Sequence, residues 1–198
     1  MDCPELETGD IVCFADSSWL SRTIKWFTRH GDEPKTKCSH IGMMFDPDRI
    51  CEALAHVKIH AVKPRLDDGW REVYRPIGLT DNDRAKMIDQ MIYYKGKRYG
   101  WWKNLAQAAD GLIGGRYFFR RLLWIDNYPI CSWLVAWVYK RFREYAKSHM
   151  TDSQFVASSI RLGKDYYFGV PPNAATPDDI HDACQDKRRF TRIYTTEA

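Results

Sequence analysis

The 198-residue sequence predicts a single α+β domain in which an antiparallel, barrel-like sheet packs against a helix that begins near Cys131. Short alternating or apolar segments separated by turns occupy the first part of the chain, and amphipathic segments with helix-capping residues follow them. A hydrophobic content of 44% beside a charged content of 28% is typical of globular proteins, and the length suits one domain. We therefore expect residues 1–198 to form one domain.

The strands are expected mainly in the first half of the chain. A turn at Gly9-Asp10, which we expect Asp10 to fix, precedes a strand over 11–14. A hairpin follows, with strands over 40–45 and 50–62. Two further strands are expected near 70–74 and 190–194.

Residues alternate cleanly along the 50–62 segment, and this alternation assigns its two faces. The small or apolar set is expected to face the core: Cys51, Ala53, Ala55, Val57, Ile59 and Ala61. The opposite face, directed toward water or a cleft, carries Glu52, Leu54, His56, Lys58 and His60. In the preceding strand the core set is Ile41, Met43 and Phe45. His40 faces the other way, so we expect His40 and Glu52 on the polar faces of neighbouring strands.

Helices are expected in four places, each with a recognisable apolar stripe or capping residue. They are residues 17–29 after Ser17 or Ser18, a segment from the capping box at Thr80 and Asp83 to just before Gly96, residues 131–146, and a short helix with Thr176 as N-cap and Pro177 in its first position. The aromatic and glycine-rich segment 99–127 receives no assignment, and we interpret it as an insertion or a substrate-groove segment.

The composition argues against several classes of protein. The net charge is only +4 and the basic residues are dispersed, so we expect no nucleic-acid partner. The N-terminal residues lack the apolar core of a secretory signal, and no segment approaches the roughly 20 apolar residues that span a bilayer. We therefore expect a cytoplasmic protein whose six cysteines are free thiols.

Cys131 is the candidate nucleophile because it falls at the expected start of a helix. Unpaired backbone N–H groups and the helix dipole favour a thiolate there. A neighbouring imidazole completes an ion pair with a thiolate, and a carboxylate orients the imidazole. His40 and Glu52 suit these two roles, and the backbone N–H of Cys131 is a natural oxyanion donor. Taken alone, however, the pattern also fits a small core cysteine, a structural histidine and a solvated glutamate.

Four short motifs occur in a distinctive order along the chain. They are Gly9-Asp10-Ile11-Val12, Ser39-His40-Ile41-Gly42, Glu52-Ala53 and Cys131-Ser132-Trp133-Leu134-Val135. This order resembles the circularly permuted branch of the NlpC-type papain-fold amidases, which includes lecithin:retinol acyltransferase-like enzymes and permuted bacterial amidases. The histidine precedes the cysteine by 91 residues (131 − 40), the reverse of the ordinary papain-like order. The segment Thr176-Pro177-Asp178-Asp179-Ile180 is similar to the family's C-terminal segment.

The resemblance implies a papain-like fold in permuted order and a cysteine hydrolase with Cys131, His40 and Glu52 as its catalytic triad. It implies amidase, peptidase or esterase activity through an acyl-thioester, or acyl transfer, with no cofactor, no metal and no obligate partner. Peptides, lipid amides and esters are all compatible substrates. A bacterial or phage origin is compatible with it as well.

The sequence leaves open the roles of some residues and two other functions. Tyr99, Trp101 and Trp102 are candidate substrate-binding residues, and the stretch around Arg120-Arg121 is compatible with peripheral membrane contact. His56 or His60 is an alternative third triad member or a substrate contact. A catalytically silent binding module on the same fold is one rival function. The other is a zinc module, with ligand-type residues at irregular spacing: Cys38, His40, Cys51, His56 and His60.

Overall fold

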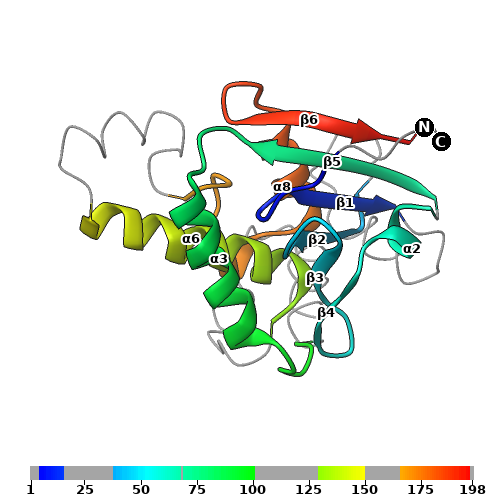
Figure 1. Ribbon diagram of the computed structural model, residues 1–198, viewed down its shortest axis with the longest axis horizontal. Coiled ribbons are helices and arrows are strands. Elements are labelled where there is room, and N and C mark those ends of the chain that lie inside the picture. The colour runs from blue at the N-terminus through cyan, green and yellow to red at the C-terminus, as the bar shows by residue number, and fades with distance from the viewer. Residues whose placement is uncertain (1–4, 16–37, 68, 101–128, 150–165, 197–198) are drawn as a thin grey trace, which may run out of the picture.

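The computed structural model describes residues 5–15, 38–67, 69–100, 129–149 and 166–196 (Figure 1). Its six strands form one antiparallel sheet in the order β4-β3-β2-β1-β5-β6. The strands are β1 (Ile11–Ala15), β2 (His40–Met44), β3 (Arg49–Ala53), β4 (Val57–Ala61), β5 (Trp70–Pro76) and β6 (Phe190–Thr195). With the helices, they confirm the expected mixed α+β class.

The sheet is open rather than barrel-like. β4 and β6 lie at its two edges, and the part of the chain that the structure describes contains no pairing between them. Figure 1 shows the strands laid side by side from β4 to β6. The barrel-like closure that we expected is therefore not found among these strands.

The 50–62 segment forms two strands rather than the single strand that we expected. β3 ends at Ala53, and β4 begins at Val57 on the other side of a turn. The pairs Cys51–Ile59 and Ala53–Val57 explain why the alternation did not reveal this turn. Partners in an antiparallel hairpin share a face of the sheet, and both members of each pair have odd numbers. The period-two pattern therefore continues unchanged through the turn.

The helices begin where the capping residues predict. Thr80 and Asp83 form a reciprocal capping box at the start of α3 (Asp81–Tyr94), and Thr176 and Asp179 form another at α8 (Pro177–Cys184). The long helix α6 (Cys131–His149) starts at the predicted residue. The short helices α2 (Lys63–Leu66) and η1 (Pro172–Ala174) were not anticipated. The expected helix over 17–29 and most of the 99–127 segment lie outside the described residues.

The turn before β1 joins the sheet to α6. Asp10 accepts the backbone N–H of Glu7 over 2.8 Å and is paired with Arg75, so it fixes the turn as predicted. Gly9 has a φ of 90°, which a glycine adopts without strain. The buried Tyr139 hydroxyl of α6 donates to the carbonyl of Gly9 over 2.7 Å. The turn is therefore held from both the sheet and the helix.

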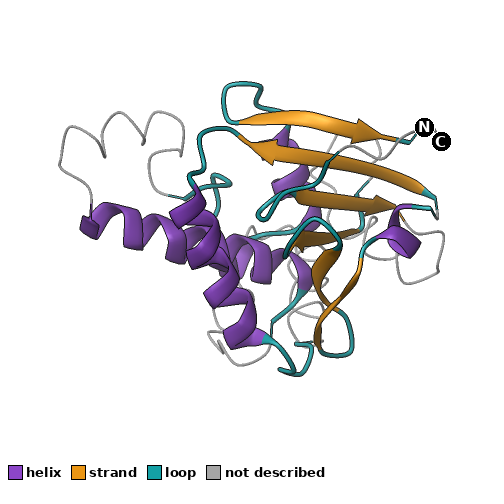
Figure 2. Cartoon of the chain, viewed as in Figure 1, coloured by secondary structure: helices purple, strands orange, loops and turns teal. Residues whose placement is uncertain are grey.

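Both faces of the central strands are buried, which decides where polar side chains can lie. One face packs against α3, α6 and α8 around a large apolar core that includes Trp133. The other face has a smaller core that includes Phe14 and Leu66 of α2. Figure 2 shows α3 and α6 lying together and α2 apart from them. The expectation that the Glu52 face meets water or a cleft is therefore wrong at Glu52 itself, which is 0% exposed.

No helix within the described ranges combines the length and the apolar character needed to cross a membrane.

Candidate active site

Cys131 is the first residue of α6, and its neighbours anchor this end of the helix. Ser132 Oγ donates to the carbonyl of Ala175 over 2.7 Å, and Trp133 Nε1 donates to Oδ1 of Asn173 over 2.7 Å. These two bonds attach the start of α6 to the segment around η1. Cys131 is 4% exposed, at a helix N-terminus that favours an anion.

His40 connects Cys131 to Glu52. Its ring lies close enough to the Cys131 thiol that each group shifts the pKa of the other, and its Nε2 lies 2.8 Å from Oε1 of Glu52. Because the carboxylate occupies Nε2, Nδ1 is the ring nitrogen left for the thiol. The ring of Phe14, with its centroid 5.6 Å away, packs against the imidazole. The structure thus brings the three predicted triad residues into one series of contacts.

Gly42 provides the space through which Glu52 reaches His40. The β2–β3 pairs Met43–Cys51 and Met44–Ile50 place Gly42 opposite Glu52 at the next step of the register. A Cβ atom at Gly42 would lie 2.9 Å from Cγ of Glu52 and 2.6 Å from Cδ1 of Ile50. Both distances are shorter than carbon atoms tolerate. The glycine is therefore required by the close approach of the Glu52 side chain.

The charges at this site stabilise a thiolate–imidazolium pair. Burial by itself would raise the pKa of Cys131, but the charge and the hydrogen bond of His40 lower it below its usual value, with help from two backbone N–H groups. Burial would lower the pKa of His40, whereas the Cys131 thiolate and Glu52 raise it to about 10. Burial would raise the pKa of Glu52, yet His40 and Arg65 lower it to about 2. These shifts all favour the charged forms: a thiolate on Cys131, an imidazolium on His40 and a carboxylate on Glu52.

Cys13, Cys51 and Cys184 differ from Cys131 in the direction of their pKa shifts. All five cysteines in the described part of the chain are free thiols, as expected. Burial raises the pKa of Cys51 to about 12 and raises the pKa values of Cys13 and Cys184 well above the ordinary value. Among these, Cys131 is distinguished by the imidazole at its sulfur.

Two further side chains complete the surroundings of Glu52. Arg65 donates from Nε to Oε2 and from Nη2 to Oε1, each over 3.2 Å. His60 Nε2 lies 2.8 Å from Oε2, although its N–H is not aligned for a hydrogen bond. His60 was a candidate on the evidence of the sequence, whereas Arg65 was not. No local pattern marks Arg65, because it belongs to a four-residue helix that only the folding of the β3–β4 hairpin brings to Glu52.

The remaining predicted contact residues are only partly within the described chain. Tyr99 is partly buried against the main core, and its N–H donates to the carbonyl of Ala55 over 3.0 Å. The next residue, Gly100, donates to the carbonyl of Pro129, close to the start of α6. Trp101 and Trp102 lie outside the described residues.

The residues considered for a zinc module do not gather into one cluster. Cys51 lies in the core on the face opposite His60, while His40 and His60 both contact Glu52. His56 is exposed at the hairpin turn, and Cys38 Sγ donates to the carbonyl of His40. Within the described ranges, these side chains therefore form no metal-ligand set.

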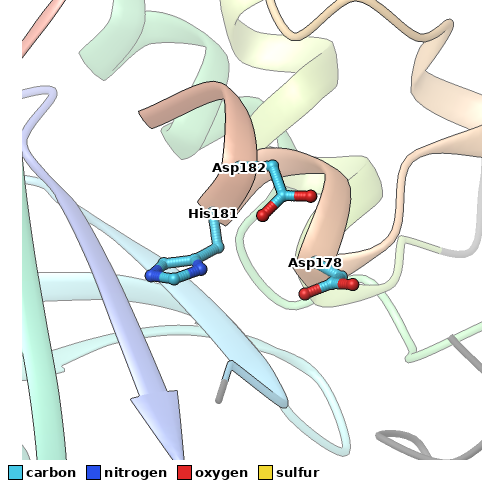
Figure 3. A group of neighbouring side chains, drawn as sticks. All are labelled: Asp178, His181 and Asp182. Atoms are coloured by element: carbon cyan, nitrogen blue, oxygen red, sulfur yellow. The ribbon is translucent and has the colours of Figure 1, made fainter. Parts of the chain in front are cut away.

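A different group of metal-ligand side chains lies on α8. It consists of Asp178, His181 and Asp182, whose ligand atoms all lie within 4.8 Å of one another. Figure 3 shows one ring nitrogen of His181 on the side of the two carboxylates. His181 Nε2 lies 2.9 Å from Oε2 of Glu72, and the Tyr74 hydroxyl donates to the same oxygen over 2.5 Å. A carboxylate behind a histidine is also the usual support of a metal-bound imidazole. Both aspartates make other interactions as well.

The fold and the site together define an α+β protein with a buried cysteine–histidine–glutamate contact series. No protein-family model matches the sequence, and no curated protein matches it significantly. The structure is similar to that of the metalloprotein yiiX from Escherichia coli O157:H7 (DUF1105), with a TM-score of 0.61 and 21% sequence identity. The similarity covers 98% of this chain and 99% of that chain. At this identity, the two proteins are shown to share a fold and nothing further.

Proposed function

We propose that this chain is a cysteine hydrolase that cleaves amide or ester bonds through an acyl-thioester on Cys131. The main support is the series of contacts from the Cys131 thiol through His40 to Glu52. A cysteine that only fills a core needs no imidazole at its sulfur, and a buried ionised glutamate is costly unless it is paired. Groups with strongly shifted pKa values also concentrate at functional sites.

The reaction would begin with the thiolate of Cys131 attacking the carbonyl carbon of the substrate. A C–S bond forms, and negative charge develops on the carbonyl oxygen, toward which the N–H of Cys131 is a natural donor. The His40 imidazolium gives its proton to the leaving amine or alcohol as the C–N or C–O bond breaks. The products of this half-reaction are a thioester on Cys131 and a neutral imidazole.

The second half-reaction would restore the site. Neutral His40 takes a proton from water, the water oxygen attacks the thioester carbonyl, and the C–S bond breaks to release the acid. Thiolate and imidazolium are regenerated. Throughout, Glu52 holds the Nε2–H of His40 and so keeps Nδ1 directed at the sulfur. An alcohol or amine in place of water would give acyl transfer.

We further propose that the fold is papain-like in circularly permuted order. In this chain the strands with His40 and Glu52 precede the helix with Cys131. A sheet of antiparallel strands packed on a helix whose first residue is the nucleophile supports that proposal. The substrates proposed are peptides, lipid amides or esters, and the protein is proposed to act without a cofactor or an obligate partner.

The experiment that tests this function compares the wild type with Cys131→Ala on panels of amides, esters and thioesters. Turnover by the wild type alone, with an acyl adduct on Cys131 detected by mass spectrometry, would support the proposal. If no substrate is turned over and Cys131 is alkylated no faster than the other cysteines, the hydrolase proposal fails. The rival function, a catalytically silent binding module, would then be favoured.

Metal binding at α8 is a second candidate function, favoured by the Asp178–His181–Asp182 group and by the description of yiiX as a metalloprotein. Two carboxylates and one imidazole suit Zn²⁺ or Mn²⁺. Ligand atoms bound at about 2.1 Å lie at most about 4.2 Å apart, so small side-chain rotations would close the set. Stoichiometric metal in the purified wild type that is lost in His181→Ala but kept in Cys131→Ala would support this candidate. Equal metal content in wild type and His181→Ala would contradict it.

A further inference from the structure

The contact between Arg65 and Glu52 is a two-point contact. Nε and Nη2 of the guanidinium each reach a different carboxylate oxygen over 3.2 Å. The Arg65 side chain is 25% exposed, whereas that of Glu52 is 0% exposed. A planar two-point contact fixes both the position and the plane of a carboxylate, which one hydrogen bond to His40 cannot do.

The guanidinium of Arg65 is itself held in place. Its Cζ lies 4.7 Å from the centre of the Phe14 ring, the same ring that packs against His40. The buried Arg71 of β5 donates from Nε to the backbone carbonyl of Arg65 over 2.6 Å, and its own Cζ lies 4.8 Å from the Phe14 ring centre. Arg65, Phe14 and His40 therefore form one packed unit around Glu52. A residue present only to neutralise charge would not need such support.

We propose that Arg65 is a positioning residue, which fixes the Glu52 carboxylate so that Glu52 in turn orients His40. This inference rests on the cysteine hydrolase function proposed above, because it assigns Arg65 a part in setting the geometry of that reaction. Arg65 acts through Glu52 and not on the reacting atoms.

Two possible actions of Arg65 have opposite consequences for His40. The charged or titratable groups around His40 and Glu52 are Cys131 from α6, His60 from β4, Arg65 from α2, and Arg71 from β5 behind Phe14. If Arg65 acted only by its charge, its loss would favour the imidazolium, and His40 would lose its proton at higher pH. If Arg65 positions Glu52, its loss loosens the bond from Glu52 to His40. The imidazolium is then less stable, and His40 loses its proton at lower pH.

The test is an NMR titration of the His40 ring in the full chain, for the wild type, Arg65→Lys and Arg65→Met. Lysine keeps the charge but cannot make the two-point contact, and methionine keeps an apolar stem over Phe14. We expect the His40 transition to move to lower pH by about one unit in both variants. A move to higher pH in Arg65→Met, or no move in either variant, would overturn the proposal.

The controls separate this outcome from a general loss of structure. Arg188→Met removes an exposed arginine–aspartate pair before β6, at the edge of the sheet opposite β4, and should leave the His40 transition unchanged. If Arg65→Met does not fold, Arg65→Lys decides alone, because a pure charge effect predicts no shift for that variant.

Kinetics provide the second readout. On any ester or amide that the wild type hydrolyses, both Arg65 variants should lower kcat about 10- to 100-fold while KM changes less than about twofold. An unchanged kcat would contradict a positioning role. If the wild type hydrolyses nothing and Cys131 is alkylated no faster than the other cysteines, the proposed function fails, but the titration still shows whether Arg65 positions Glu52. The two failures are therefore distinguishable.

Discussion

A Cβ atom at Gly42 would lie 2.9 Å from Cγ of Glu52, so the absence of a side chain at Gly42 is what allows this carboxylate to pass over β2 toward His40. The relationship explains how a fully buried glutamate reaches a histidine on the neighbouring strand. The relationship can be tested, because a single methyl group at residue 42 would fill this space.

Gly42→Ala should abolish the fast alkylation of Cys131, because Glu52 must move away from His40 to make room. The added Cβ would also lie 2.6 Å from Cδ1 of Ile50, and overpacking of this kind costs about 1–3 kcal/mol. The double variant Gly42→Ala/Ile50→Val removes the shortest contact, that with Cδ1 of Ile50, but leaves Cγ1 of residue 50 at 3.0 Å and keeps the Glu52 clash. We expect it to regain part of the lost thermal stability without regaining Cys131 reactivity. Wild-type reactivity in Gly42→Ala would show that Glu52 does not depend on this space.

Cys131 should be alkylated by iodoacetamide at pH 6 much faster than the other described cysteines. His40 lowers the pKa of the Cys131 thiol against the opposing effect of burial, while burial raises the pKa values of Cys13, Cys51 and Cys184. An ordinary thiol with a pKa of about 8.5 is less than about 1% ionised at that pH. Peptide mapping by mass spectrometry measures each site separately. Equal rates at all sites would contradict the thiolate–imidazolium pair.

Glu52→Gln should move the alkaline limb of the pH profile of hydrolysis to lower pH. Burial opposes the charge on His40, but the Cys131 thiolate and Glu52 raise the pKa of His40 to about 10. Removing the carboxylate charge destabilises the imidazolium, which would supply the proton to the leaving group. We expect a shift of about one pH unit or more in the profile of kcat. The same substitution at an exposed glutamate, Glu144→Gln, serves as the control. If the alkaline limb of the pH profile does not shift in Glu52→Gln, Glu52 does not have the proposed role.

Acid should destabilise the wild type more than Glu52→Gln. The pKa of Glu52 falls from 4.5 to about 2 on folding, because His40 and Arg65 outweigh the cost of burial. A lowered carboxyl pKa contributes stability above pH 4.5, and that stability is lost as the pH falls through about 2. Between pH 5.5 and pH 3, the wild type should lose about 2 kcal/mol of unfolding free energy relative to the variant. Urea unfolding at several pH values measures the difference; parallel curves would contradict it.

Local signals in the sequence predicted most of the secondary structure. The capping residues Thr80 and Thr176 identified the starts of two helices, because a cap bonds to N–H groups only three residues away. The start of α6 at Cys131 was also predicted from the sequence. The alternation of residues did not reveal the turn between β3 and β4. Paired residues of this hairpin are both odd-numbered or both even-numbered, so the same pattern continues through the turn.

The sequence by itself determined the candidates Cys131, His40 and Glu52, because residue type, helix position and strand parity are local properties of the chain. Only the tertiary structure decided that Glu52 is buried, that Gly42 gives it room, and that Arg65 and His60 also contact it. The Arg65 contact depends on α2 covering the second face of the sheet, and the His60 contact depends on the pairing of β3 with β4. Burial on both faces arises from elements far apart in the sequence, so no window of neighbouring residues contains it.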